Sequence, residues 1–165
     1  ENVDNELNFK KIISVLDEIE KKYKKKIIIS THPRTRKKID SINSSENISF
    51  LKPFGFFDYI KLQKNAYCVI SDSGTISEES SILGFPAITI RESHERPEAM
   101  DEGTLIMSGL SLKNIINSID IIVEYSKKNI KPKVVHDYNF DNISSKVIKI
   151  IYSYAGYVND NVWKK

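Results

Sequence analysis

Short runs of branched, apolar residues alternate along this chain with segments of helical period, and this alternation limits the fold more than any other feature. The runs predict β-strands at residues 26–30, 48–51, 67–71, 86–90 and 104–107. The segments between them predict helices at 5–24, 33–42, 56–66, 75–83, 112–128 and 142–154. Strands that alternate with helices build a parallel sheet with helices on both faces. The sequence therefore predicts an α/β, Rossmann-like fold whose loops after the strands meet at one edge, where ligands bind.

Size and charge narrow the class of protein further. The chain has 165 residues, 40% of them hydrophobic and 28% charged, which suits one domain over 1–165 with 141–165 as a C-terminal helix and tail. The net charge is only +3, and the densest basic run, 21–26, ends a predicted helix, so we expect no nucleic-acid partner. No apolar run reaches the roughly 20 residues of a membrane span, so we expect no membrane partner either.

The cysteine and histidine content does not indicate metal chemistry. Cys68 is the single cysteine, so no disulfide can form within the chain, and we expect a cytoplasmic protein in a reducing compartment. His94 has no cysteine or second histidine nearby and does not predict a metal site. We therefore expect the chain to use neither a metal nor a cofactor.

The turn after the predicted strand at 67–71 carries the residues best suited to bind a ligand. It holds Ser73 and Gly74, and a predicted helix begins at once at Thr75. Amides at a helix start can bind a phosphate, a glycine lets the ligand approach the backbone, and the two hydroxyls add donors. Glu78 and Glu79 lie about one helical turn further on, where a carboxylate could accept both hydroxyls of a ribose. An alternative needs no ligand, because Thr75 and Glu78 have the spacing of a capping box.

An arginine in the next loop is expected at the same edge of the sheet. Arg96 follows the predicted strand at 86–90, and its guanidinium could close on phosphates bound at the turn. The alternative is a salt bridge to Glu92 or Glu98 within the same loop. The spacing along the chain leaves both interpretations open.

Aromatic residues follow an earlier strand at that edge. They are Phe54, Phe56, Phe57 and Tyr59. One of these rings could stack on a nucleobase. The alternative is core packing, because Phe56 and Tyr59 are three residues apart and share one helical face.

Taken together, these motifs resemble the signature of the non-hydrolysing UDP-N-acetylglucosamine 2-epimerase family. The family pattern is Asp-Ser-Gly-Gly-x-x-Glu-Glu, then Gly-x-Pro, then Arg and Glu-Arg-Pro-Glu. The chain has DSGTISEE at 72–79, GFP at 84–86, Arg91, and ERPE at 95–98. The resemblance covers essentially the whole chain and is strongest from 50 to 107. It implies the C-terminal half of a GT-B-like two-domain fold, with the active site between the domains and a homodimer as the full-length enzyme.

The resemblance also implies which residues bind the diphosphate of a UDP-sugar. Ser73 and the backbone amides of Gly74 and Thr75 would hold it, and Arg96 would reach the same phosphates. These assignments agree with what the turn and the loop indicate by themselves.

The nucleoside end of the same UDP-sugar is assigned in the same way. Glu79 would bind the ribose hydroxyls, and the segment around Phe57 and Tyr59 would cradle the uracil.

Two departures from the family pattern bear on the sugar and on the missing parts. Thr75 replaces the family's second Gly, and with THPRT at 31–35, PFGFF at 53–57 and VWKK at 162–165 it resembles the branch that makes UDP-N-acetyl-L-fucosamine. That branch inverts C2 of a 2-acetamido-2,6-dideoxy-L-hexose on UDP for surface polysaccharides. The residues at 1–2 resemble the end of the family's His-Arg-x-Glu-Asn motif. We therefore expect that His and Arg, and the N-terminal domain with the family's acid–base carboxylates, to be absent from this chain.

The resemblance implies an isomerase that eliminates UDP across C1–C2 of the sugar and adds it back on the other face. We expect this chain to supply the leaving-group site and to be inactive alone, because Glu92, Glu95 and Glu98 are candidates for the base by location only. The alternative is a nucleotide-sugar-binding domain of a GT-B glycosyltransferase or of a sensor. The ERPE loop at 95–98 favours the epimerase.

Overall fold

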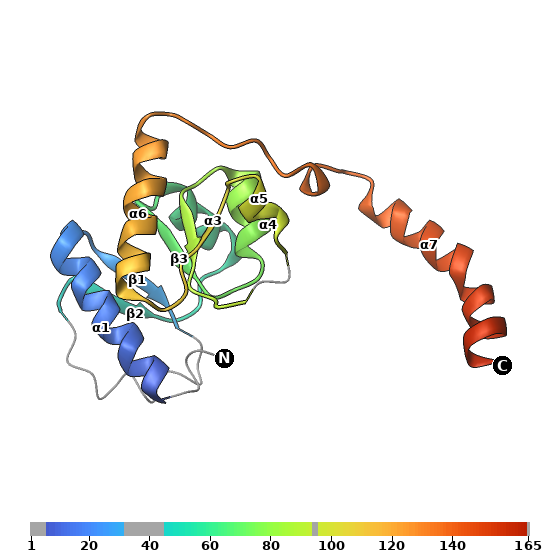
Figure 1. Ribbon diagram of the computed structural model, residues 1–165, viewed down its shortest axis with the longest axis horizontal. Coiled ribbons are helices and arrows are strands. Elements are labelled where there is room, and N and C mark those ends of the chain that lie inside the picture. The colour runs from blue at the N-terminus through green and yellow to red at the C-terminus, as the bar shows by residue number, and fades with distance from the viewer. Residues whose placement is uncertain (1–5, 32–44, 94–95, 165) are drawn as a thin grey trace. The chain divides into compact units, whose positions relative to one another are not determined.

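The computed structural model describes residues 6–31, 45–93 and 96–164, which belong to two compact units (Figure 1). The first unit runs to Val135 and contains every strand of the described residues, and the second begins at His136. Three predicted features lie outside the described residues: the helix at 33–42, all but the first residue of the THPRT motif at 31–35, and the residues at 1–2.

The strand pairs of the first unit are parallel, as the alternating sequence pattern predicts. Strand β1 (Ile27–Ser30) pairs with β2 (Ile48–Leu51) in a two-stranded sheet. Strands β3 (Val69–Ser71), β4 (Ala87–Thr89) and β5 (Ile106–Met107) form a three-stranded sheet in that order. The predicted α/β fold is confirmed, with its strands divided between two sheets. Because β3, β4 and β5 are parallel, their carboxyl ends lie at one edge.

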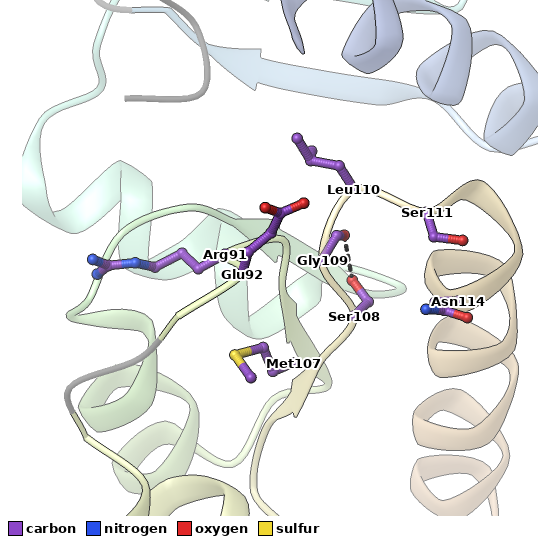
Figure 2. Close-up of a pocket in the computed structure, with 8 residues that line it drawn as sticks. All are labelled: Arg91, Glu92, Met107, Ser108, Gly109, Leu110, Ser111 and Asn114. Carbon is purple, nitrogen blue, oxygen red and sulfur yellow. Dashed lines mark hydrogen bonds between the residues drawn. The ribbon is translucent and has the colours of Figure 1, made fainter.

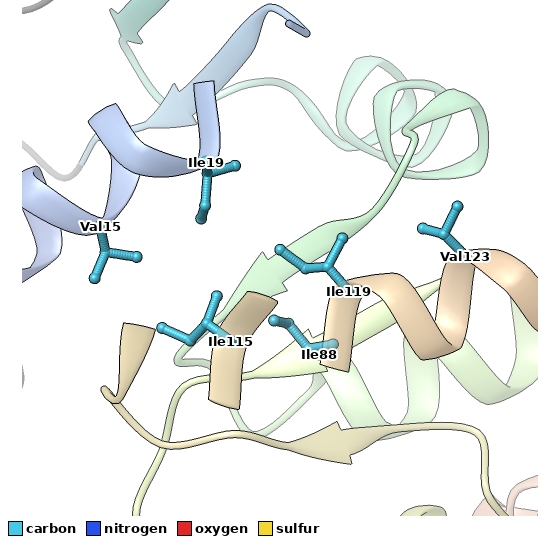
Figure 3. Close-up of a cluster of buried hydrophobic side chains, with 6 residues drawn as sticks. All are labelled: Val15, Ile19, Ile88, Ile115, Ile119 and Val123. Carbon is cyan, nitrogen blue, oxygen red and sulfur yellow. The ribbon is translucent and has the colours of Figure 1, made fainter. Parts of the chain in front are cut away.

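Two long helices cover one face of the three-stranded sheet. Helix α1 (Glu6–Tyr23), helix α6 (Leu112–Lys127) and strand β4 share one buried apolar cluster. Its members, drawn in Figure 3, are Val15, Ile19, Ile88, Ile115, Ile119 and Val123. Tyr23 Oη and Lys22 Nζ also join the helices, because they donate to the Asp120 carboxylate over 2.8 and 2.6 Å. This face is therefore held mainly by apolar packing.

The other face of β4 packs against α4 (Ile76–Leu83). Successive strand residues point to opposite faces, so Ala87 and Thr89 point away from the cluster that contains Ile88. The buried residues of α4 are Ile76, Ser77, Ser80 and Ser81. Serines are small, so the helix can lie close to the sheet. The helix ends at Gly84, whose φ of 67° is the left-handed conformation expected of a residue that stops a helix.

Two further helices of the first unit border the same edge. Helix α3 (Phe56–Asn65) precedes β3 and confirms the helix predicted at 56–66. The short helix α5 (Glu98–Asp101) follows Pro97 in the charged segment 91–103, where the sequence allows a helical turn after that proline. Both helices therefore bring side chains toward the loops in which the ligand site is predicted.

The second unit is helical. A 3₁₀ turn η1 (His136–Tyr138) precedes α7 (Ile143–Val158), which continues as a π-helical segment η2 (Asn159–Trp163). The helix predicted at 142–154 is confirmed and extends further than predicted. Among the described residues of both units, no helix is both apolar and long enough to span a membrane.

Candidate functional site

The candidate site is the turn between β3 and α4, at the carboxyl edge of the three-stranded sheet. Ser71 ends β3, and α4 begins at Ile76, so only four residues form the connection. The loops that follow β4 and β5 leave the sheet at the same edge, because all three strands are parallel. The location predicted for the phosphate-binding turn is thus the one that the topology provides.

Hydroxyl groups of the turn organise its own backbone. Ser73 N donates to Ser71 Oγ over 3.1 Å, and Thr75 N donates to Ser73 Oγ over 3.4 Å. Ser73 Oγ and Thr75 Oγ1 lie 3.0 Å apart. Thr75 makes no side-chain cap to the helix, so the capping-box interpretation is wrong. The box does not form because Glu78, its other residue, makes an ion pair with Arg96 instead.

Two guanidinium groups lie beside the turn at Gly74. A Cβ atom added at Gly74 would lie 3.3 Å from Arg91 Nη1 and 3.8 Å from Arg96 Nη1. Arg96 Nη1 also donates to Glu78 Oε1 over 2.5 Å, in an ion pair whose side chains are 41% and 32% exposed. The structure therefore places the predicted Arg96 at the turn and adds Arg91, which the motif contains but the predicted site does not. No carboxylate within 4 Å of Arg91 is found among the described residues.

The carboxylate of Glu79 is held at both oxygens. Thr75 Oγ1 donates to Glu79 Oε1 over 2.8 Å, and Gln63 Nε2 donates to Glu79 Oε2 over 2.5 Å. Gln63 comes from α3 and is 3% exposed. Burial, and then the charge of Glu79, raises the pKa of Tyr59, while a hydrogen bond with Gln63 acts in the opposite direction. Tyr59, Gln63, Thr75 and Glu79 therefore form one polar cluster.

Gln63 was not among the predicted site residues, although the sequence holds a signal for it. Gln63 lies four residues after Tyr59 on the same helix, so both side chains are on one face. A polar residue on the inward face of a helix, next to a residue already predicted to bind ligand, indicates a buried polar contact. The partner of Gln63 could not be read from the sequence, because Glu79 lies on a different helix.

The aromatic residues at the start of α3 are not part of the core. Phe56 and Phe57 are 73% and 84% exposed, and their rings meet edge to face with centroids 5.5 Å apart. Core packing is therefore the wrong interpretation for these two rings, because the buried residue of α3 is Gln63, near the other end of the helix. Tyr59 is half-buried and contacts the polar cluster. A role for Phe57 and Tyr59 in holding a base stays a prediction.

A shallow depression with a mixed polar and apolar lining lies beside the turn (Figure 2). It has a volume of about 320 Å³ and is formed by the ends of β4 and β5 and the start of α6. The lining residues are Arg91, Glu92, Met107, Ser108, Gly109, Leu110, Ser111 and Asn114. In Figure 2 the Arg91 side chain extends away from Leu110 and Asn114, and its guanidinium is the one beside Gly74. Arg91 thus borders both the turn and the depression. The lining residues that follow β5 were not among the predicted site residues.

Metal ligands do not gather at this edge. Within 6–31, 45–93 and 96–164, no group of three or more His, Cys, Asp or Glu side chains could hold a metal ion. His94 and Glu95 lie outside the described residues. The donors at the turn are guanidinium, hydroxyl and amide groups, which suit an anion.

Comparison with known proteins gives consistent matches along most of the chain. A family model described as UDP-N-acetylglucosamine 2-epimerase matches residues 1–152. The UDP-N-acetylglucosamine 2-epimerase of Methanococcus maripaludis is 38% identical over 133 residues, which are 77% of this chain and 36% of that protein.

Solved structures match in fold as well as in sequence. The structure of UDP-N-acetylglucosamine 2-epimerase from Rickettsia bellii is 44% identical, with a TM-score of 0.85 over 98% of this chain and 45% of its own. The Methanocaldococcus jannaschii enzyme in complex with UDP-GlcNAc and UDP is 32% identical, with a TM-score of 0.79 over 92% of this chain and 42% of its own. The chain therefore spans less than half the length of these relatives.

Proposed function

Because this chain belongs to the UDP-N-acetylglucosamine 2-epimerase family, we propose that it binds the UDP moiety of a UDP-N-acetylhexosamine while the sugar is inverted at C2. The observation that carries this proposal is the pair of guanidinium groups, Arg91 and Arg96, beside Gly74 at the start of α4. Two positive groups, helix-start amides and the Ser73 hydroxyl converge where a glycine leaves the backbone open. A diphosphate has the charge and the size for this place.

The geometry suggests how the chain helps the leaving group. When the bond between C1 and the diphosphate oxygen breaks, the bonding electron pair and the negative charge go to the diphosphate. Arg91, Arg96 and the amides of the turn would stabilise that charge as it develops. Glu78 holds Arg96 through an ion pair in the free chain, and a bound phosphate would compete for the same guanidinium. The chain acts on the leaving group and leaves proton transfer at C2 to other parts of the enzyme.

The nucleoside end of the ligand would lie toward α3. Glu79 is the acceptor for the ribose hydroxyls, and the exposed Phe57 and half-buried Tyr59 offer rings for the uracil. Stacking of a base on such rings contributes to binding without strict selection of the base. Ser73, Gly74, Thr75, Glu79, Arg96, Tyr59 and Phe57 are thus proposed as the UDP site, with Arg91 added.

The whole protein is proposed as an isomerase of surface polysaccharide precursors. It would pair this unit with an N-terminal domain, work as a homodimer and act in the cytoplasm, where the thiol of Cys68 stays reduced. Thr75, in place of the family's second Gly, supports the UDP-N-acetyl-L-fucosamine branch. The glycosyltransferase alternative has no such support, because each relative named above is an epimerase.

A titration of the chain with UDP, followed by calorimetry, tests the proposal. We expect a Kd of roughly tens of micromolar to millimolar, about 4–6 kcal/mol of binding, since half of the cleft belongs to another domain. Arg96→Ala removes a charge-assisted contact of about 1.5–3 kcal/mol and should weaken binding at least tenfold. Lys11→Ala, an exposed charge on α1, is the matched control and should bind as the unsubstituted chain does. Equal affinities of the three proteins, or no UDP binding by any of them, would contradict the proposal.

A further inference from the structure

The Glu79 carboxylate is fixed by groups from two helices. Thr75, at the start of α4, donates to Oε1, and Gln63, in the last turn of α3, donates to Oε2. The two donors approach different oxygens, so they fix the plane of the carboxylate as well as its position. An exposed glutamate without such donors would rotate about its last side-chain bond.

Each oxygen keeps the capacity to accept another hydrogen bond. An ionised carboxylate offers about four acceptor positions, and Thr75 and Gln63 occupy two of them, one on each oxygen. The remaining positions are therefore also one on each oxygen. Glu79 is only partly buried and Thr75 is exposed, so a ligand can reach the group from solvent. This arrangement matches two neighbouring hydroxyls, each donating to one carboxylate oxygen.

Gln63 is held in one orientation by its surroundings. It is 3% exposed, and its Oε1 has no hydrogen-bond partner among the described residues. Reversing the amide would bring Oε1 against Glu79 Oε2, where two acceptors repel. A buried carbonyl oxygen without a partner costs stability. Simple packing at this position would be served as well by an apolar side chain, which indicates that the amide is there for Glu79.

We propose that Gln63 and Thr75 are positioning residues that hold Glu79 as a two-oxygen acceptor for the 2′- and 3′-hydroxyls, and that they set the preference of the site for ribo- over 2′-deoxyribonucleoside diphosphates. The inference rests on the proposed function, because it names the determinant of selectivity within the same UDP site. It adds Gln63 to the site and gives the Thr75 side chain a role beside that of its backbone amide, and neither side chain contacts the ribose itself.

The test compares the Kd of UDP with that of 2′-deoxy-UDP for each protein. Gln63→Met keeps the length of the side chain and removes the amide, and Thr75→Val keeps the shape and removes the hydroxyl. We expect each to lower the ratio of the two affinities about three- to tenfold, because one carboxylate oxygen is no longer held. Thr75→Ser keeps a hydroxyl and should keep the ratio. Glu79→Gln gives the ratio expected when the carboxylate is lost altogether.

The possible outcomes separate this inference from the proposal on which it rests. If Gln63→Met and Thr75→Val weaken UDP and 2′-deoxy-UDP by the same factor, the two residues are structural and the inference is overturned, while UDP binding stands. If the unsubstituted chain binds no UDP, the proposed function fails and the inference fails with it. Thermal unfolding identifies a variant that does not fold. If Gln63→Met does not fold, the comparison of Thr75→Val with Thr75→Ser tests the inference instead.

Discussion

The two faces of strand β4 pack against residues of different polarity. On one face Ile88 packs into an apolar cluster with α1 and α6. On the other, the buried residues of α4 include three serines, and the neighbouring α3 contributes a buried glutamine. This difference shows that one face contributes most of the apolar packing, while the candidate site lies on the other. Apolar packing holds one side, while the polar side orients groups that a ligand can use.

The largest expected effect comes from opening the apolar face. Ile119 is 1% exposed, and Ile119→Ala leaves a cavity between α6 and the sheet. We expect the free energy of unfolding, measured by urea titration, to fall by about 2–5 kcal/mol. Ile121→Ala, at a site that is 49% exposed on the same helix, should change it by less than about 1 kcal/mol. A large loss in both variants would show that α6 does not have the one-sided burial described here.

A change on the polar face should affect binding more than folding. In Gly74→Ala the new Cβ meets Arg91 Nη1 at 3.3 Å, and the far end of that flexible side chain can shift. We therefore expect little change in unfolding free energy, but about tenfold weaker UDP binding by calorimetry, because the methyl group takes the place of the phosphate. Gly156→Ala, in α7, is the matched control, since a Cβ atom added there would meet no neighbouring side chain within 4 Å. Unchanged UDP affinity in Gly74→Ala would separate the turn from the ligand.

The smallest effect concerns pH and the junction between α1 and α6. Hydrogen bonds from Lys22 and Tyr23 lower the pKa of Asp120 below its ordinary 3.8. A carboxyl group whose pKa is lowered by folding stabilises the fold above its unfolded value, and this contribution is lost as the pH falls through the lower, folded value. We expect unfolding free energy to decline below about pH 4, and to decline less in Asp120→Asn. The effect is modest because Asp120 is exposed. Identical pH profiles for both proteins would show that the contacts are not formed in solution.

Much of the candidate site follows from local pattern. Ser73, Gly74 and Thr75 lie between a strand and a helix that both form where periodicity predicts them, and Gly84 ends that helix with a positive φ. Such features depend on residues close in the chain. The capping box failed for a different reason, because Thr75 and Glu78 each had a competing partner. Local spacing lists the contacts that are available, but it does not rank them against contacts made from elsewhere in the fold.

By itself, then, the sequence determined the alternation of strands and helices, the turn that follows β3 and the residue types at that turn. Only the tertiary structure decided that Arg96 pairs with Glu78, that Arg91 lies beside Gly74, and that Gln63 reaches Glu79. The physical reason is distance along the chain. Periodicity states which side chains share a face of one helix or strand. Which faces meet depends on how the elements pack around the sheet, and residues 16 to 18 positions apart become partners only there.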